Sequence, residues 1–144
     1  MDILVINGPN LGMLGVREPE IYGHTTLGDI VVALRSHART WQQPPTVRHL
    51  QTDSVSRCIA RLAQRDFAAL IINPGAWTHY CYAIRDALAA LDVPIVEVHI
   101  SKVDQREAFR QINVIREVVT HTISGQGWRG YLEALDFLET QLAS

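Results

Sequence analysis

The chain has 144 residues, the usual size of a single domain, and 47% of them are apolar. This apolar share excludes a disordered chain and is sufficient for a core that needs neither a metal nor disulfides. Thirteen basic and fifteen acidic residues leave a net charge of -2, which provides no attraction for nucleic acid or an anionic membrane surface. We therefore expect one domain over residues 1–144 that binds neither nucleic acid nor membrane.

The sequence has no segment typical of a membrane span or a signal peptide. The longest run without a charged residue, 67–84, is interrupted by Asn73-Pro74-Gly75 and His79. The two cysteines, Cys58 and Cys81, follow helical apolar periodicities and do not have metal-ligand spacing. We expect them to be reduced core thiols in a cytoplasmic protein.

Short apolar runs alternate with amphipathic segments along the whole chain, which predicts strands alternating with helices. Five runs have the length and composition of buried strands: 3–6, 47–51, 68–72, 94–98 and 118–124. Apolar residues recur at helical spacing in four segments: 27–41, 55–62, 82–91 and 131–142. This alternation indicates an α/β fold with a parallel sheet covered on both faces.

Two of the helices have recognisable start signals. Thr26, with Asp29 three residues later, is a capping box, and Asp53 is expected to cap the helix that follows the second strand. Pro44-Pro45 stops the first helix.

The expected strands fit a flavodoxin-like three-layer sandwich, with a five-stranded parallel sheet in the order 2-1-3-4-5. In this order the first, third and fourth strands are neighbours, and ligands bind beyond the carboxyl ends of the strands. The loops that begin at Asn7, Asn73 and His99 would therefore converge on one site.

The first of these loops is rich in glycine but matches no phosphate-binding fingerprint, and its Pro9 has no N–H to offer. The segment continues through Arg17 to Tyr22. A tyrosine acts as a base near neutral pH only when a nearby cation favours its phenolate, and Arg17 is a candidate cation. Spacing alone favours the simpler interpretation, in which both are ordinary loop residues and Arg17 pairs with a nearby glutamate.

The end of the fourth strand carries polar residues where apolar ones are expected. Period two places Glu97, His99 and Ser101 on one face, and a carboxylate beside a histidine orients the ring and favours a proton donor. A strand end with satisfied polar groups is an equally good interpretation. Further along, Arg106 and Arg110 are one helical turn apart, which suits a bound carboxylate or a solvated face.

Taken together, these motifs resemble the type II 3-dehydroquinate dehydratases over essentially the whole chain. The matching stretches are Asn7-Gly8-Pro9-Asn10-Leu11, Arg17-Glu18-Pro19, Tyr22-Gly23, Asn73-Pro74-Gly75-Ala76, Thr78-His79, Arg85-Asp86-Ala87, Glu97-Val98-His99-Ile100-Ser101, Arg106-Glu107 and Phe109-Arg110. The resemblance implies a flavodoxin-like fold and anti elimination of water from 3-dehydroquinate through an enolate, with no metal, cofactor or covalent intermediate. It also implies a homo-oligomer, with trimers packed into dodecamers.

The resemblance implies a role for each matching residue. Tyr22 would remove the proton alpha to the ketone, and Arg17 would keep it ionised. His99 would protonate the leaving hydroxyl, with Glu97 holding its ring. A water held by Asn10 would stabilise the enolate, a task suited to a preorganised donor.

Other matching residues are implied to bind the substrate. Those matched to positions that contact its hydroxyls and carboxylate are Asn73, His79, Ile100, Ser101 and Arg110. Arg106 matches a lid arginine, and Asp86 matches a residue that reaches the site of a neighbouring subunit.

Some positions depart from the family pattern, chiefly 51–55 and 111–117, and Trp77 is bulkier than the usual residue there. One alternative is therefore a non-catalytic paralogue that binds a related cyclic hydroxy acid. A flavodoxin-like nucleotide or flavin module is a second alternative, which the first loop disfavours. A Schiff-base route is also disfavoured, because the only lysine is Lys102 and period two turns it away from the face of His99.

Overall fold

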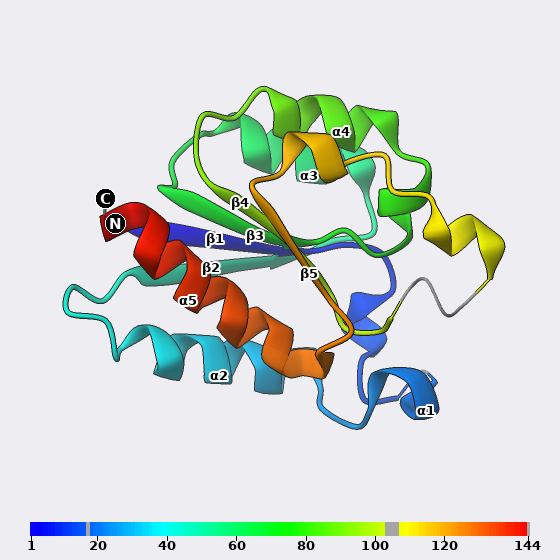
Figure 1. The fold of residues 1–144 in the computed structure, drawn as a ribbon, viewed down its shortest axis with the longest axis horizontal. Helices are drawn as coiled ribbons and strands as arrows, with labels where there is room; N and C mark the ends of the chain where they lie inside the picture. Colours follow the sequence, from blue (N-terminus) through cyan, green and yellow to red (C-terminus); the bar gives the residue numbers. More distant parts are fainter. Residues whose placement is uncertain (17, 103–106, 144) are drawn as a thin grey trace.

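The computed structural model describes residues 1–16, 18–102 and 107–143, and it contains one parallel sheet between two layers of helices (Figure 1). The strands are β1 (Asp2–Asn7), β2 (Thr46–Gln51), β3 (Ala69–Asn73), β4 (Ile95–His99) and β5 (His121–Ser124). Their order across the sheet is β2-β1-β3-β4-β5, and every pair is parallel. The predicted fold class and strand order are therefore confirmed.

The strand register brings the carboxyl ends to one edge. Asn7 at the end of β1 pairs with Gln51 on one side and Asn73 on the other. At the end of β4, His99 pairs with Ser124. The loops that leave these strands consequently start from neighbouring points, as expected for this topology.

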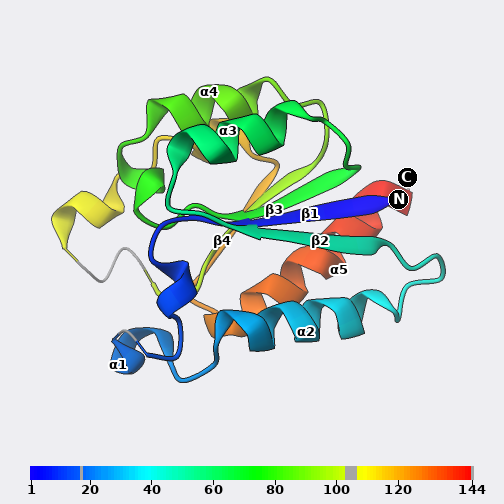
Figure 2. The same ribbon diagram turned by 180° about the vertical axis from the view of Figure 1, so that it is seen from behind.

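Helices cover both faces of the sheet. α2 (Leu27–Ala38) and α5 (Gly130–Ala143) lie on one face, and α3 (Val55–Ala63) and α4 (Tyr82–Ala89) lie on the other (Figures 1 and 2). Alternate residues of β1 divide between the two resulting cores: Ile3 and Val5 pack toward α2 and α5, and Leu4 packs toward α3 and α4. All of them are buried, because period two points successive side chains to opposite faces.

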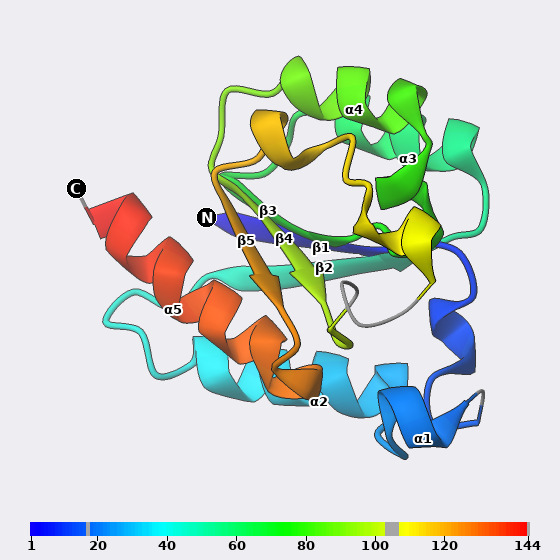
Figure 3. The same cartoon turned by 45° about the vertical axis from the view of Figure 1, so that its right-hand side comes forward.

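Short helices gather around the carboxyl edge of the sheet. They are α1 (Pro19–Tyr22), η1 (Leu11–Met13), η2 (Gly75–His79) and η4 (Ala108–Gln111), and Figure 3 shows them beyond the ends of the strands. Two further short helices flank β5, namely η5 (Arg116–Val118) and η6 (Gly127–Arg129). Among the described residues, none of the helices combines the length and the apolar character needed to cross a membrane.

The helix starts were predicted partly correctly. The capping box of α2 is present, because Thr26 Oγ1 accepts the Asp29 N–H and the Asp29 carboxylate accepts the Thr26 N–H. The prediction that Asp53 caps α3 is wrong. Ser54 is the cap, since its Oγ accepts the Arg57 N–H. The Asp53 carboxylate instead accepts the backbone N–H of Asn10.

Element boundaries also differ from the sequence prediction. The first helix ends at Ala38 and not at Trp41, although Trp41 is buried in the same core. The last strand starts at His121 and not at Val118, because residues 116–118 form η5. Asn113 Oδ1 accepts the N–H groups of Ile115 and Arg116 where this turn begins, which stabilises the turn.

Candidate active site

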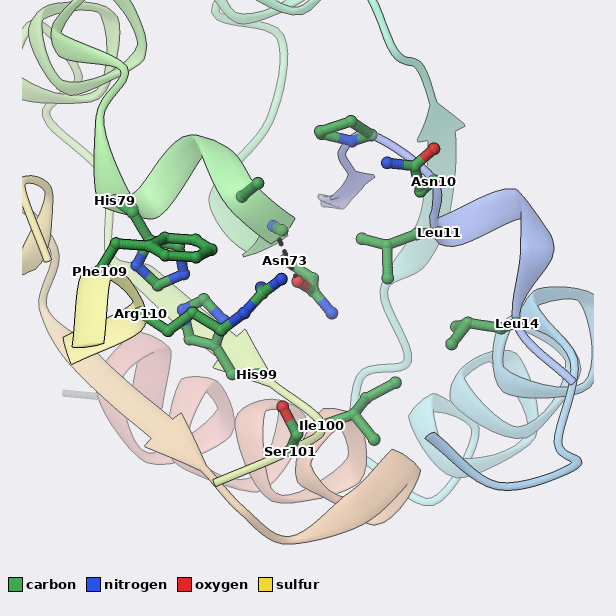
Figure 4. A pocket seen from close by; sticks show the side chains of 13 residues that line it. Asn10, Leu11, Leu14, Asn73, His79, His99, Ile100, Ser101, Phe109 and Arg110 are labelled. Carbon is green, nitrogen blue, oxygen red and sulfur yellow. Dashed lines mark hydrogen bonds between the residues drawn. The ribbon is translucent and has the colours of Figure 1, made fainter. Parts of the chain in front are cut away.

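A pocket of about 230 Å³ opens beyond the carboxyl ends of β1, β3 and β4 (Figure 4). Three loops and η4 supply the residues that line it: Pro9, Asn10, Leu11, Leu14, Asn73, Gly75, Ala76, His79, His99, Ile100, Ser101, Phe109 and Arg110. The loops that begin at Asn7, Asn73 and His99 therefore converge, as their positions after neighbouring strands predicted.

Seven of the residues singled out from the sequence line this pocket: Asn10, Asn73, His79, His99, Ile100, Ser101 and Arg110. Glu97 lies directly beneath them. Asp86 is exposed on α4 and is not among the residues that line the pocket of its own chain. Tyr22 ends α1, but its side chain and the whole of Arg17 and Arg106 lie outside the part of the chain that the structure describes.

Glu97 and His99 form a buried pair at the end of β4. The side chain of Glu97 is fully buried, and its Oε2 accepts a hydrogen bond from Nε2 of His99. This bond uses one ring nitrogen of His99 and leaves Nδ1 for other partners. A carboxylate in this position fixes the orientation of the ring.

Three more side chains donate to the same carboxylate. They are Thr78 at 2.9 Å from Oε2, Asn113 at 3.1 and 3.0 Å from Oε1 and Oε2, and Thr122 at 3.2 Å from Oε1. A buried carboxylate with this many donors is stable in its ionised form. None of these donors was identified from the sequence as part of the site.

The environment of Glu97 has opposing effects on its ionisation. Burial acts to raise the pKa of the carboxyl, and the hydrogen bond and charge of His99 act against burial. With the hydrogen bonds from Asn113 and Thr78 added, the pKa of Glu97 lies below its usual value. Glu97 is thus a negative charge under the pocket.

His79, on η2, is held differently. Its Nδ1 donates to the backbone oxygen of Ile112 at 2.7 Å, and its ring meets Phe109 edge to face at 5.8 Å between centroids. Burial lowers the pKa of His79, and the charges of His99 and Arg110 act in the same direction. The bond to the Ile112 carbonyl opposes this shift without reversing it. His79 is therefore a neutral ring whose Nε2 can accept a hydrogen bond.

Arg110 extends from η4 over the pocket, where Figure 4 shows its guanidinium beside His79 and His99. Its Nε donates to Glu107 at 2.5 Å, and its guanidinium carbon lies 4.8 Å from the centre of the Phe109 ring. The side chain is only 17% exposed. A cation this well shielded is suited to binding an anionic group of a ligand.

Asn73 is fixed by a hydrogen-bond network on the face of the sheet that α5 covers. Its Oδ1 accepts the Gly75 N–H at 3.1 Å, and its Nδ2 donates to the Tyr131 hydroxyl at 2.9 Å. Tyr131 in turn donates to Asn7 Oδ1 at 2.5 Å, and burial raises the pKa of its hydroxyl. Asn73 retains one amide hydrogen for a ligand. Tyr131 and Asn7, the supports of Asn73, were not identified from the sequence.

Asn10 lies on the opposite rim, in a left-handed conformation with φ of 68°. Its backbone N–H donates to Asp53 Oδ1 at 3.0 Å, and Gln51 Nε2 donates to the same oxygen at 3.2 Å. Gln51 Nε2 also donates to the Gly8 oxygen at 3.1 Å. Part of segment 51–55, which departs from the family pattern, therefore holds the loop that carries Asn10.

Two further features of the described residues concern metal ligands and the lysine. No group of three or more His, Cys, Asp or Glu side chains in the described part of the chain is arranged to hold a metal ion. Lys102 is exposed and is not among the residues that line the pocket.

Comparisons with known proteins agree with this architecture. The family model of dehydroquinase class II matches residues 1–139. The 3-dehydroquinate dehydratase of Thermotoga maritima is 46% identical over 142 residues, which are 99% of this chain and 97% of that protein.

Two solved structures are also similar. The type II dehydroquinase from Butyrivibrio crossotus has a TM-score of 0.91 and 42% identity, covering 96% of this chain and 97% of that one. The type II dehydroquinase from Propionibacterium acnes has a TM-score of 0.89 and 45% identity, covering 96% of both chains. From the family match and the full-length identity together, the chain belongs to the class II dehydroquinase family.

Proposed function

We propose that this protein is a 3-dehydroquinate dehydratase that removes water from 3-dehydroquinate by anti elimination, through an enolate and without a Schiff base. Family membership and the 46% identity to the Thermotoga maritima enzyme support the overall reaction. The observation that carries the site assignment is the buried Glu97 carboxylate, which holds His99 at the wall of the pocket.

In the first step, the phenolate of Tyr22 takes the proton alpha to the ketone of the substrate. The electron pair of the broken C–H bond forms the enolate double bond, and the carbonyl π electrons move onto the oxygen. Arg17 favours the phenolate by its charge, and a water held by Asn10 donates to the enolate oxygen. These assignments follow the resemblance of the Arg17 to Tyr22 stretch to the family.

In the second step, the enolate collapses and the C–O bond to the leaving hydroxyl breaks. The electron pair leaves with the oxygen, and His99 donates a proton to form water. Nε2 of His99 is bonded to Glu97, so Nδ1 is the nitrogen that delivers the proton. Glu97 stabilises the imidazolium before the transfer. These steps require a base, an acid and a donor to the enolate oxygen.

The remaining pocket residues bind the substrate. Arg110 pairs with the carboxylate of 3-dehydroquinate, and Nε2 of His79 accepts a hydrogen bond from a hydroxyl group. Further contacts come from three residues of the lining: Asn73, Ile100 and Ser101. Arg106 acts as a lid arginine.

We also propose that the protein is a homo-oligomer in which trimers pack into a dodecamer. Asp86 is exposed on α4, outside the pocket of its own chain, where it is available to a neighbouring subunit. Cys58 and Cys81 are buried free thiols, which supports a reducing cytoplasmic location. Light scattering coupled to size-exclusion chromatography measures the oligomeric state directly, and a monomer would refute the proposed homo-oligomer.

The formation of 3-dehydroshikimate tests the proposed function. The product contains a conjugated enone, so ultraviolet absorbance should rise when the purified protein is added to 3-dehydroquinate. Binding of 3-dehydroquinate without any rise in absorbance would instead identify a non-catalytic paralogue that holds a related cyclic hydroxy acid.

A further inference from the structure

The three-residue segment 112–114 forms hydrogen bonds with His79, Thr78 and Glu97, which lie in or next to the pocket. The Ile112 carbonyl accepts the Nδ1–H of His79 at 2.7 Å, and the Val114 N–H donates to the Thr78 carbonyl at 2.8 Å. Between them, the Asn113 side chain reaches the carboxylate of Glu97. The segment therefore links η2 and β4, which carry the two histidines of the pocket.

The amide of Asn113 has a defined orientation. Its Oδ1 accepts the backbone N–H groups of Ile115 and Arg116, both at 2.9 Å. Only an oxygen can accept these bonds, so Nδ2 has to face Glu97. There it lies 3.1 Å from Oε1 and 3.0 Å from Oε2.

Asn113 differs from the other donors to Glu97 in two respects. The hydroxyls of Thr78 and Thr122 each approach one carboxylate oxygen and can also act as acceptors. The amide nitrogen only donates, and it approaches both oxygens. It therefore favours an ionised Glu97 in one orientation, which is the form that holds the ring of His99.

We propose that Asn113 is a positioning residue for proton transfer by His99, acting through Glu97. The inference rests on the proposed function, because it gives His99 the role of acid. Among the described residues, the charge of His99 on β4 acts on Glu97, and the charges of His99, Glu97 and Arg110 on η4 act on the neighbouring His79 on η2.

The substitution Asn113→Asp separates this role from a purely structural one. Asp keeps an oxygen for the N–H groups of Ile115 and Arg116 but replaces the donor to Glu97 with a second carboxylate oxygen. We expect kcat to fall about 100-fold near neutral pH, within the range attributed to acid catalysis, with KM changed by less than about threefold.

The pH profile of this variant should also change. At lower pH, one of the two facing carboxyl groups binds a proton and becomes a donor to the other. The ratio of the kcat of Asn113→Asp to that of the unmodified protein should therefore rise as the pH falls. Asn113→Ala also loses kcat, but it has no group to protonate and should not recover.

Gln111→Glu is the matched control, since it makes the same change of amide to carboxylate on the exposed last residue of η4, two positions before Asn113. Its kcat should stay unchanged. A kcat of Asn113→Asp within about threefold of the unmodified protein at all pH values would overturn the proposal.

A measurement without substrate keeps this test separate from the proposed function. The NMR signals of the His99 ring, recorded without substrate, report how the Glu97 carboxylate holds this ring. These signals should shift in both Asn113→Asp and Asn113→Ala, because the carboxylate loses a donor in both variants, and they should stay unchanged in Gln111→Glu. Identical His99 ring signals in the unmodified protein, Asn113→Asp and Asn113→Ala would overturn the inference, whereas failure to form 3-dehydroshikimate would overturn only the proposed function.

Discussion

The two histidines of the pocket are held in opposite ways. His99 contacts a buried carboxylate through Nε2, whereas His79 contacts a backbone carbonyl through Nδ1. The carboxylate fixes the orientation of the His99 ring, whereas burial lowers the pKa of His79 and keeps its ring neutral. In the proposed function, this difference assigns proton donation to His99 and hydrogen-bond acceptance to His79.

The largest effect is expected when the imidazole ring that contacts Glu97 is removed. His99→Ala should lower kcat by roughly 10²- to 10⁴-fold and change KM little, because a proton donor matters most while the C–O bond breaks. Steady-state kinetics with the enone assay measure both parameters. If the variant kept the full rate, the acid would have to be another residue.

Arg110 tests whether binding and proton transfer are separate in this pocket. Arg110→Ala should raise KM by roughly 10- to 100-fold, since a charge-assisted bond to the substrate carboxylate is lost. The kcat at saturating substrate should fall much less than in His99→Ala. An unchanged KM would show that the carboxylate binds elsewhere.

His79 should give a smaller effect of the same kind. His79→Gln removes one hydrogen bond to a substrate hydroxyl, which is worth a several-fold increase in KM. The pH dependence of kcat should stay that of the unmodified protein, because a neutral ring contributes no proton. A shifted pH profile in this variant would mean that His79, and not only His99, takes part in proton transfer.

The same comparison predicts how the fold responds to acid. The folded pKa of His79 lies below its usual value of 6.5, so below that pH the unfolded chain binds a proton that the folded chain does not. The contribution of His79 to the free energy of unfolding is fully present above pH 6.5 and decreases as the pH falls toward the folded pKa of His79. His49 acts in the same direction, because burial also lowers its pKa.

Glu97 adds a second loss at lower pH. Its folded pKa lies below its usual 4.5, so its contribution to stability is present above 4.5 and is lost as the pH falls through the folded pKa.

The His79 prediction can be measured apart from the effect of Glu97. Unfolding by urea between about pH 8 and about pH 5 should show a smaller decline of the unfolding free energy in His79→Gln than in the unmodified protein. Equal slopes would contradict the assignment of a neutral, buried His79.

Most of the fold was predictable because its signals are local. Apolar runs marked all five strands to within three residues, and the Thr26 capping box marked the start of α2. The errors fall where a distant partner overrides a local pattern. Asp53 has the composition of a cap, but its carboxylate binds the Asn10 N–H, 43 residues away, so the next residue caps α3.

The candidate site also combines features with a local sequence signal and features that depend on distant partners. The adjacency of Glu97 and His99 was predictable because two residues on one face of a strand are neighbours by period two. The groups that hold Glu97 in place come from 16, 19 and 25 residues away, and no local pattern joins Asn113, Thr78 and Thr122 to it. Ser101 lines the pocket although β4 ends at His99, so strand periodicity does not account for its position.

The smallest expected effect concerns Lys102. It tests whether a lysine amine takes part in the reaction in addition to the two histidines. A dehydration next to a ketone can also proceed through an iminium, which needs a lysine in the site with a depressed pKa. Lys102 is the only lysine of the chain, is exposed, and packs its aliphatic stem beside Gly125, outside the pocket lining. We therefore expect Lys102→Ala to keep most of its activity, and borohydride added with substrate to leave the mass and activity of the protein unchanged. A borohydride-stable adduct on Lys102, detected by mass spectrometry, would replace the enolate mechanism with an iminium one and would remove His99 and Glu97 from their central role.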